Sequence, residues 1–314
     1  MRRGLSNRQR CVLAAVIVLV GSGCTPRGQG FCIGPPNFAY RQIDVPGAAS
    51  THPRGVRNMG SGLDATVVGY YVDAERRVHG FRREPGGAII AIDVPGATET
   101  RALGINNNGE VVGIYNDAGG TKAFQLAPGG SPITIGNPAV PDAWSVNDDG
   151  IVAGSFTDPP GKSHGFTFPP GLGGPINVGN NFPTHLYGIN NTRAMTGAMQ
   201  DSPAGPFKAF YLSGSDTASF RAIPLSDVDE SAAYGINNVV LPQCVDHVGT
   251  YSRSGHDHGF VHWGSNVLAP IDAVIASVTV TDTRVYAISD EWQMVGEYVV
   301  DGDRAVHGFI ATPQ

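Results

Sequence analysis

The chain has little charge and no helical hydrophobic pattern. Only 15% of its 314 residues are charged, and the formal net charge is −6. No basic cluster follows the first ten residues, so the chain lacks the positive surface that nucleic-acid-binding proteins need. No window sustains an apolar period of about 3.6 residues, which argues against a helical architecture. The net charge is also too low for a disordered chain, so we expect a folded protein with many turns.

Long apolar runs are missing too. The run Cys11–Val20 is shorter than the roughly 20 residues that cross a membrane as a helix. Four positive charges precede it, at Arg2, Arg3, Arg8 and Arg10. Small residues, Gly21–Gly23, follow it, and this order is typical of a secretory signal peptide. We therefore predict that residues 1–23 are a signal peptide and that the protein is exported.

Cysteine is scarce, and Cys24 stands directly after the small residues. This arrangement resembles the lipobox of bacterial lipoproteins, in which the Cys is acylated, although Gly21 stands where a large aliphatic residue is usual. We expect Cys24 to carry a lipid that anchors the protein to the outer membrane, on its periplasmic or cell-surface face. The alternative is a secreted protein, cut after Gly23 by an ordinary signal peptidase. Residues 24–37 are rich in Gly and Pro and predict a flexible tether.

Two further cysteines, Cys32 and Cys244, remain after the signal peptide is removed. An exported protein reaches a compartment that permits disulfides. We predict that Cys32 pairs with Cys244, and the alternative is two separate thiols.

The chain is rich in Gly (43 residues) and Pro (23 residues), and it repeats itself. Each repeat contains a string like Gly-Ile-Asn, then one like Val-Gly-Tyr, then a His-Gly-Phe or Lys-Ala-Phe triplet. The triplets end at Phe81, Phe124, Phe166, Phe210, Phe260 and Phe309. The β-branched and aromatic strings favour strands, and the Asn-Asn-Gly and Asp-Asp-Gly strings mark tight turns between them.

The period of the repeat, about 42–50 residues, indicates how many strands it holds. Four strands with four short connections need roughly 40–48 residues. Four-stranded units of this period are the blades of a β-propeller. We expect the Gly-Ile-Asn strand to lie innermost and the Ile-Asp-Val-Pro strand to form the rim, where proline is tolerated.

The two ends of the chain are expected to share one blade. The string Ile92–Ala97 ends the first repeat, and nearly the same string, Ile43–Ala48, stands before any complete repeat. The last repeat lacks a fourth strand after Phe309. We predict that a strand at Ile43–Val45 completes this blade, because closing the ring hides both sheet edges. The predicted fold is an all-β, six-bladed β-propeller of four-stranded antiparallel blades, in one domain at 38–314. The alternatives are a five- or seven-bladed ring and a β-solenoid.

These repeat strings, together with Ile-Asp-Val-Pro-Gly-Ala, resemble the bacterial HAF family of extracellular repeats, named after a His-Ala-Phe triplet. The likeness covers nearly all of residues 38–314. The triplet departs from the family pattern, because it reads His-Gly-Phe four times and Lys-Ala-Phe twice. The resemblance implies an extracellular repeat protein without an established activity, and so it implies no catalytic residues.

Patterns that carry chemistry are few. The string Gly161–Gly165 reads G-x-S-x-G, but it lies between two expected strands instead of at a strand-to-helix turn, so we interpret it as chance. The densest group of ligand-type side chains contains His256, His258 and Asp246. The two histidines share one strand face, and imidazoles with a carboxylate can hold a transition metal. The alternative is a structural role, because His258 is the histidine of the repeat. We predict no catalytic residue and no cofactor.

The innermost strands are expected to present polar side chains to the channel. These are Asn106, Asn147, Asn190 and Asn237. Amides bind sugars or water but cannot act as general bases near neutral pH. They favour a binding or interaction module of the cell envelope, whose ligand is a glycan, a protein or a small molecule. The alternatives are a propeller-type hydrolase or lyase with an active site at the channel mouth, and a purely structural envelope role.

Overall fold

The computed structural model describes residues 36–57, 64–135, 142–158, 161–168, 176–178, 182–202, 204–213, 220–238, 245–263, 267–303 and 305–314. These residues belong to the second of two compact units, Cys32–Gln314. Residues 1–35, and with them Cys24 and Cys32, lie outside the described ranges, as does Cys244, so the signal peptide, the lipid and the disulfide stay predictions. Within the described ranges, no helix is long and apolar enough to cross a bilayer.

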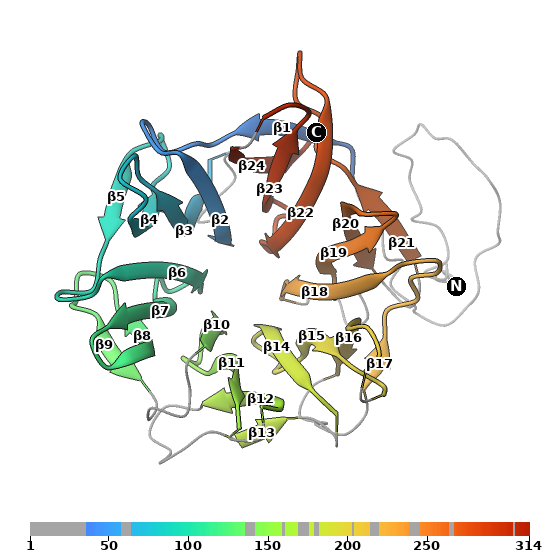
Figure 1. The fold of residues 1–314 in the computed structure, drawn as a ribbon, viewed down its shortest axis with the longest axis horizontal. Coiled ribbons are helices and arrows are strands. Elements are labelled where there is room, and N and C mark those ends of the chain that lie inside the picture. The colour runs from blue at the N-terminus through green and yellow to red at the C-terminus, as the bar shows by residue number, and fades with distance from the viewer. Residues whose placement is uncertain are drawn as a thin grey trace, which may run out of the picture. The chain divides into compact units, whose positions relative to one another are not determined.

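Six four-stranded antiparallel sheets surround a central axis, and each is one blade of a six-bladed β-propeller (Figure 1). From its innermost strand outward, the first blade contains β2 (Ser50–Arg57), β3 (Thr66–Val72), β4 (Val78–Arg83) and β5 (Ile89–Ile92). The other blades are described in the same order. The second contains β6 (Glu99–Ile105), β7 (Val111–Asp117), β8 (Gly120–Leu126) and β9 (Ile133–Ile135). The third contains β10 (Asp142–Val146), β11 (Val152–Thr157), β12 (Ser163–Phe168) and β13 (Ile176–Val178).

The other three blades repeat this plan. The fourth contains β14 (Thr184–Ile189), β15 (Met195–Met199), β16 (Lys208–Leu212) and β17 (Arg221–Ala222). The fifth contains β18 (Glu230–Ile236), β19 (His247–Arg253), β20 (His256–Trp263) and β21 (Val267–Ile271). The sixth contains β22 (Val280–Ile288), β23 (Met294–Val300), β24 (Val306–Pro313) and β1 (Phe38–Gln42). The predicted fold class, blade number and strand count are confirmed.

The N-terminal strand closes the ring, but it lies a few residues before the predicted position. β1 pairs along its whole length with β24. The N–H of Ile43 adds one hydrogen bond to the carbonyl of Gly308 (2.9 Å), after the strand has ended. The string Ile43–Val45 therefore follows the closing strand, and β5 likewise ends at Ile92, where the matching string begins. The prediction that these strings form the rim strands is corrected accordingly.

Proline and glycine explain this displacement. In the turn Val45–Ala48, the N–H of Ala48 donates to the carbonyl of Val45 (3.1 Å), and Gly47 has a φ of +80°. Proline at the second position and a positive φ at the third are typical of a type II turn. Val94–Ala97 closes in the same way (3.0 Å). The string is thus a connection that leads from the rim of one blade to the innermost strand of the next.

The repeat phenylalanines and glycines form the core of each blade. The six phenylalanine side chains are almost fully inaccessible: Phe81, Phe124, Phe166, Phe210, Phe260 and Phe309. Each ring packs on the glycine of the Val-Gly-Tyr string opposite it. At Gly249, a Cβ would lie 2.0 Å from the carbonyl oxygen of Ala232 and 2.7 Å from the Phe260 ring. Because only glycine fits between a strand carbonyl and a buried ring, the same residue recurs in every blade.

Candidate functional site at the channel mouth

Every innermost strand carries a β-bulge at the same place. In β6 the register with β7 shifts between Ala102 and Gly104, which leaves Leu103 as the extra residue. The six equivalent residues, which we call the bulge ring, are Arg54, Leu103, Trp144, Tyr187, Tyr234 and Tyr286. A bulge re-aims side chains and commonly lies next to a functional site. All six residues line the central channel, which holds a cavity of about 90 Å³.

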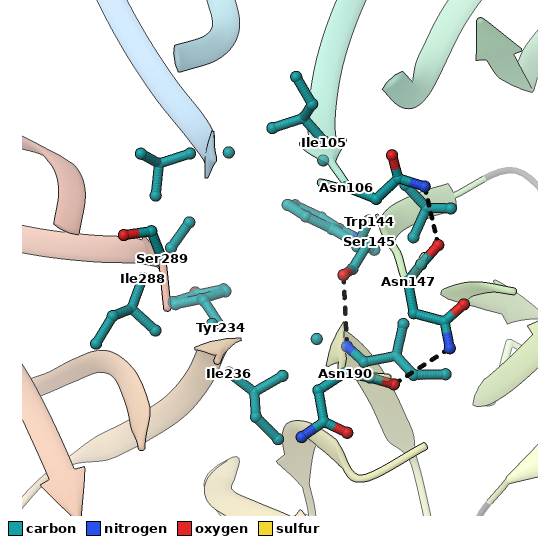
Figure 2. A pocket seen from close by; sticks show the side chains of 18 of the residues that line it. Ile105, Asn106, Trp144, Ser145, Asn147, Asn190, Tyr234, Ile236, Ile288 and Ser289 are labelled. Atoms are coloured by element: carbon teal, nitrogen blue, oxygen red, sulfur yellow. Dashed lines mark hydrogen bonds between the residues drawn. The ribbon is translucent and has the colours of Figure 1, made fainter. Parts of the chain in front are cut away.

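Four neighbouring members of the bulge ring are aromatic, and they contact one another in series. The ring centroids of Trp144 and Tyr187 lie 5.0 Å apart, those of Tyr187 and Tyr234 lie 4.7 Å apart, and those of Tyr234 and Tyr286 lie 4.9 Å apart. The guanidinium carbon of Arg54 lies 3.7 Å from the Tyr286 centroid, as in a cation–π contact. We call the four rings the aromatic arc; Figure 2 shows Trp144 and Tyr234 on two sides of the channel.

A second cavity, of about 320 Å³, adjoins the aromatic arc, and we call it the mouth cavity. Tyr187, Tyr234 and Tyr286 line it from the arc. Its other lining residues include His185, Phe207, Glu230, Thr250, Ser252, Asp257 and Arg284. Several of these stand at or before the start of their strands, so the mouth cavity lies where the innermost strands begin. Aromatic walls with a few polar groups are the usual composition of a ligand pocket.

Several polar groups of the mouth cavity are unpartnered. The hydroxyls of Tyr187 and Tyr234, the ring nitrogens of His185 and the Glu230 carboxylate form no hydrogen bond or ion pair with any other described residue. Thr250 Oγ1 is buried without a partner in the same part of the chain. Burial lowers the pKa of His185, so its ring is neutral near neutral pH. These groups can therefore donate to or accept from a ligand.

A charged network borders the aromatic arc between the sixth and first blades. Glu297, whose side chain is 5% exposed, accepts hydrogen bonds from Arg54 (2.9 Å), Arg284 (3.1 Å) and the Tyr286 hydroxyl (3.0 Å). The Nδ1 atom of His52 lies 2.9 Å from its Oε2 atom. Burial alone would raise the pKa of Glu297, but Arg54 and His52 outweigh it and hold the pKa well below its usual range. Glu297 is therefore an ionised carboxylate fixed in one orientation.

Three of the four asparagines predicted for the channel donate to the next blade, and Asn237 donates within its own blade. Asn106 donates from Nδ2 to the carbonyl of Asn147 (2.9 Å), and Asn147 donates to that of Asn190 (3.2 Å), as Figure 2 shows. Asn190 donates to the carbonyl of Asn237 (3.0 Å), and Asn237 to the carboxylate of Asp246 (2.9 Å). Three of the four border the channel cavity, and Asn237 does not. At no more than 4% exposure, their amides form hydrogen bonds within the ring instead of contacting a ligand.

A belt of Asn and Asp side chains lies at the end of the channel opposite the mouth cavity. Four of its members directly follow these asparagines in the chain, and the fifth follows the equivalent Ser289: Asn107, Asp148, Asn191, Asn238 and Asp290. The backbone N–H of each of the first four donates to the side chain of the next, over 2.7–2.8 Å. Asn107 also reaches the Asp290 carboxylate (3.4 Å). These oxygens are occupied by neighbouring blades, so free polar groups concentrate at the mouth cavity.

The three residues predicted as metal ligands do not come together. In the hairpin of β19 and β20, His247 stands opposite His262 and Arg253 opposite His256. Asp246, which precedes His247, is therefore at the other end of the hairpin from His256. His258 Nδ1 lies 3.2 Å from Asp272 Oδ1, and the equivalent repeat histidine His307 contacts Asp44 in the same way. No group of three or more His, Cys, Asp or Glu side chains that could hold a metal occurs within the described ranges.

The sequence contains one signal for the aromatic arc, which is visible only when the repeats are aligned. In four repeats an aromatic residue directly precedes the small residue of the Gly-Ile-Asn string, at positions 144, 187, 234 and 286. The tryptophans alone are too few and too scattered in the sequence to indicate an aromatic binding platform. The bulge that turns this position into the channel is not visible in the sequence. Glu297 stands where the other repeats carry uncharged residues: Tyr70, Ile114, Ser155, Ala198 and Thr250.

No family model matches the chain, and no curated protein does, so the HAF resemblance stays a prediction. Solved structures with a similar fold include TolB from Acinetobacter baumannii (9% identity, TM-score 0.54, over 79% of this chain and 64% of that one). AofleA from Arthrobotrys oligospora has 12% identity and a TM-score of 0.52, over 88% and 86%. XC5397 from Xanthomonas campestris, a gluconolactonase, has 11% identity and a TM-score of 0.51, over 93% and 100%. At these identities the likeness establishes that the chain has a β-propeller fold.

Proposed function

We propose that the protein is an exported, lipid-anchored binding module of the cell envelope, and that its ligand is a saccharide bound in the mouth cavity. The observation that carries this proposal is the aromatic arc beside a cavity of about 320 Å³ that contains several unpartnered polar groups. The same position of the repeat supplies all members of the arc, so the fold itself builds the platform.

The chemistry of the mouth cavity suits a hydroxyl-rich ring. The apolar face of a sugar ring can pack on the rings of Tyr187 and Tyr234, and aromatic side chains contribute much of the binding energy at such surfaces. Sugar hydroxyls can pair with the two tyrosine hydroxyls and with the neutral His185 ring. Glu230 supplies one unpaired carboxylate, which accepts hydroxyl hydrogen bonds strongly. Arg284, in contrast, is already paired with Asp257 (2.6 Å) and Glu297, which disfavours an anionic ligand.

A screen of the purified protein on an array of glycans and peptidoglycan fragments tests this proposal. We expect at least one saccharide to bind, and Tyr234→Ala to weaken that binding tenfold or more. Tyr115→Phe is the control, because Tyr115 lies on β7, away from the mouth cavity, and bonds Thr134. Binding that survives Tyr234→Ala unchanged, or an array with no ligand, contradicts the proposal.

The envelope location rests on the sequence, and it has its own test. In a bacterial host, the wild-type protein should incorporate labelled palmitate and sediment with membranes. Cys24→Ser should abolish both, whereas Cys32→Ser should abolish neither. Release of the wild-type protein as an unmodified chain beginning near Cys24 would instead favour the secreted alternative. The Cys32–Cys244 pairing is checked on the same material by peptide mass with and without a reductant.

A further inference from the structure

We propose that Ser50, His52 and Glu297 form a nucleophile, base and carboxylate that hydrolyse carboxylic esters at the edge of the mouth. The Oγ atom of Ser50 lies 2.9 Å from Nε2 of His52. On the other side of the ring, Nδ1 of His52 lies 2.9 Å from Oε2 of Glu297. A serine, a histidine and a carboxylate in hydrogen-bonded series are the arrangement that activates a serine hydroxyl, whatever the fold that carries it.

The surroundings of Glu297 select the productive form of His52. The ionised carboxylate, held by Arg54 and Arg284 (2.9 and 3.1 Å), can only accept a hydrogen bond, so Nδ1 of His52 must be the donor in the contact between them. With its hydrogen on Nδ1, the ring turns an unprotonated Nε2 toward the Ser50 hydroxyl. Tyr70 stacks on the same ring, with centroids 4.5 Å apart and an angle of 17°, which holds its plane.

The fold does not impose these residues, because the other blades fill the same positions differently. In the second blade Glu99 and Arg101 stand where the first blade has Ser50 and His52, and they form an ion pair (2.9 Å). Glu297 is paired in register with Arg284, at the place where the first blade pairs His52 with Tyr70. The combination therefore occurs where the sixth blade meets the first, between residues 245 positions apart in the chain.

The reaction balances with water as the second reactant. Ser50 Oγ adds to the ester carbonyl carbon while its proton moves to His52 Nε2. The bond from that carbon to the alcohol oxygen then breaks, and His52 gives the proton to the departing alcohol. Water next gives a proton to His52 and adds to the acyl carbon, the bond to Ser50 breaks, and Ser50 regains its proton as the acid leaves.

Labelling with a fluorophosphonate probe tests the inference without any knowledge of the natural ligand. Peptide mapping should place the probe on Ser50 of the wild-type protein, and Ser50→Ala should abolish labelling. His52→Gln should slow it at least tenfold, because the base is gone while the serine remains. Ser226→Ala is the control, since Ser226 is an exposed serine that contacts Arg253 only through its carbonyl. Hydrolysis of p-nitrophenyl acetate should follow the same order.

Three outcomes overturn the inference: no probe on Ser50, labelling that His52→Gln leaves unchanged, or ester hydrolysis that survives Ser50→Ala. Circular dichroism of each variant excludes unfolding as the cause of a loss. The probe carries no sugar, so its reaction does not depend on the mouth cavity. Labelled Ser50 without saccharide binding contradicts the proposed function alone, and saccharide binding without labelling contradicts the triad alone.

Discussion

The side-chain amide of Asn190 donates to the backbone carbonyl of Asn237 on the next blade, over 3.0 Å. Its Oδ1 atom meanwhile accepts hydrogen bonds from the backbone N–H groups of Thr192 (3.1 Å) and Ala194 (2.9 Å). One buried side chain thus closes the turn of its own blade and fastens that blade to its neighbour. Asn106 and Asn147 do the same at the preceding boundaries.

Asn190→Ala should lower the free energy of unfolding by about 2 kcal/mol, because it leaves the buried carbonyl of Asn237 and the buried N–H of Ala194 unpaired. Asp149→Ala, in the equivalent turn of the third blade, is the control. Its exposed side chain bonds to no other residue of the described ranges, so the variant should change stability by less than about 0.5 kcal/mol. Urea unfolding of both variants measures the difference. Equal effects would contradict the role of Asn190 in joining blades.

The fold could be predicted because the repeat itself carries the information. Six similar strings, 42–50 residues apart and each with turn residues, indicated the blade count, and the extra string Ile43–Ala48 indicated the closure. The strand boundaries could not be predicted to the residue, since Val-Pro-Gly-Ala is compatible with a rim strand and with a type II turn. Hydrogen bonds from Ala48 to Val45 and from Ala97 to Val94 decide for the turn.

In the sixth blade, the contacts of His307 with two aspartates should stabilise the fold in a pH-dependent way. His307 Nδ1 lies 2.7 Å from Asp44, and its Nε2 lies 3.2 Å from Asp303. Burial alone would lower the pKa of His307, but these carboxylates outweigh it and raise the pKa above its usual value. The contacts of His307 therefore stabilise the fold fully below the pKa of the unfolded histidine, about 6.5. This contribution is lost as the pH rises through the pKa of His307 in the folded protein.

The wild-type protein should exceed His307→Gln in stability by about 1 kcal/mol at pH 6, and by less at pH 9. Urea unfolding of both proteins at the two pH values gives the comparison. An advantage of the wild type that grows with pH would show that the imidazole is neutral in the folded protein.

A buried histidine pair should make the protein less stable at low pH, which is the opposite of the effect of His307. His247 and His262 approach within 3.2 Å through their Nδ1 atoms, and Tyr211 stacks on His247. Burial, and then the nearby His262, lower the pKa of His247 to about 3. A depressed pKa contributes stability above the unfolded pKa of about 6.5, and that contribution is lost as the pH falls toward 3.

His247→Gln removes the ionisable group, so the stability difference between wild type and variant should shrink as the pH falls below about 6.5. Burial raises the pKa of Asp246 to about 6, so Asp246 also titrates in this range. The effect of Asp246 cancels when the stabilities of the two proteins are subtracted, because both proteins contain it. Thermal unfolding of both proteins between pH 7 and pH 4 measures this stability difference. A difference that stays constant over that range would rule out a buried neutral His247.

The glycine of the Val-Gly-Tyr string should tolerate no side chain. Gly249→Ala places a Cβ 2.0 Å from the Ala232 carbonyl oxygen, so we expect a loss of about 3 kcal/mol or more. At Gly130 the nearest atom to a new Cβ, the carbonyl oxygen of Ala127, is 3.3 Å away, and Gly130→Ala should cost less than about 0.5 kcal/mol. Similar melting temperatures for the two variants would show that the blade can spread at Gly249.

The candidate site was less predictable than the fold, for a physical reason. The asparagines of the innermost strands were expected to offer amides to the channel, yet Asn190 is 2% exposed and fully hydrogen-bonded within the ring. Channel contacts depend instead on the bulge, which turns Tyr234 and its equivalents inward. The bulge forms only when the two strands of a blade pair, and a contact such as His52 with Glu297 exists only once the blades have assembled.

The central claim is that the mouth cavity is the ligand site, and Glu230 offers its most direct test. Its exposed carboxylate has no partner among the residues described, so Glu230→Ala should leave folding intact. Glu75→Ala, on the hairpin between β3 and β4, removes the same charge elsewhere. Calorimetric titration of the best saccharide from the array should show affinity about tenfold weaker, or about 1.4 kcal/mol, for Glu230→Ala and unchanged for Glu75→Ala. Equal affinities for Glu230→Ala and wild type would contradict the claim.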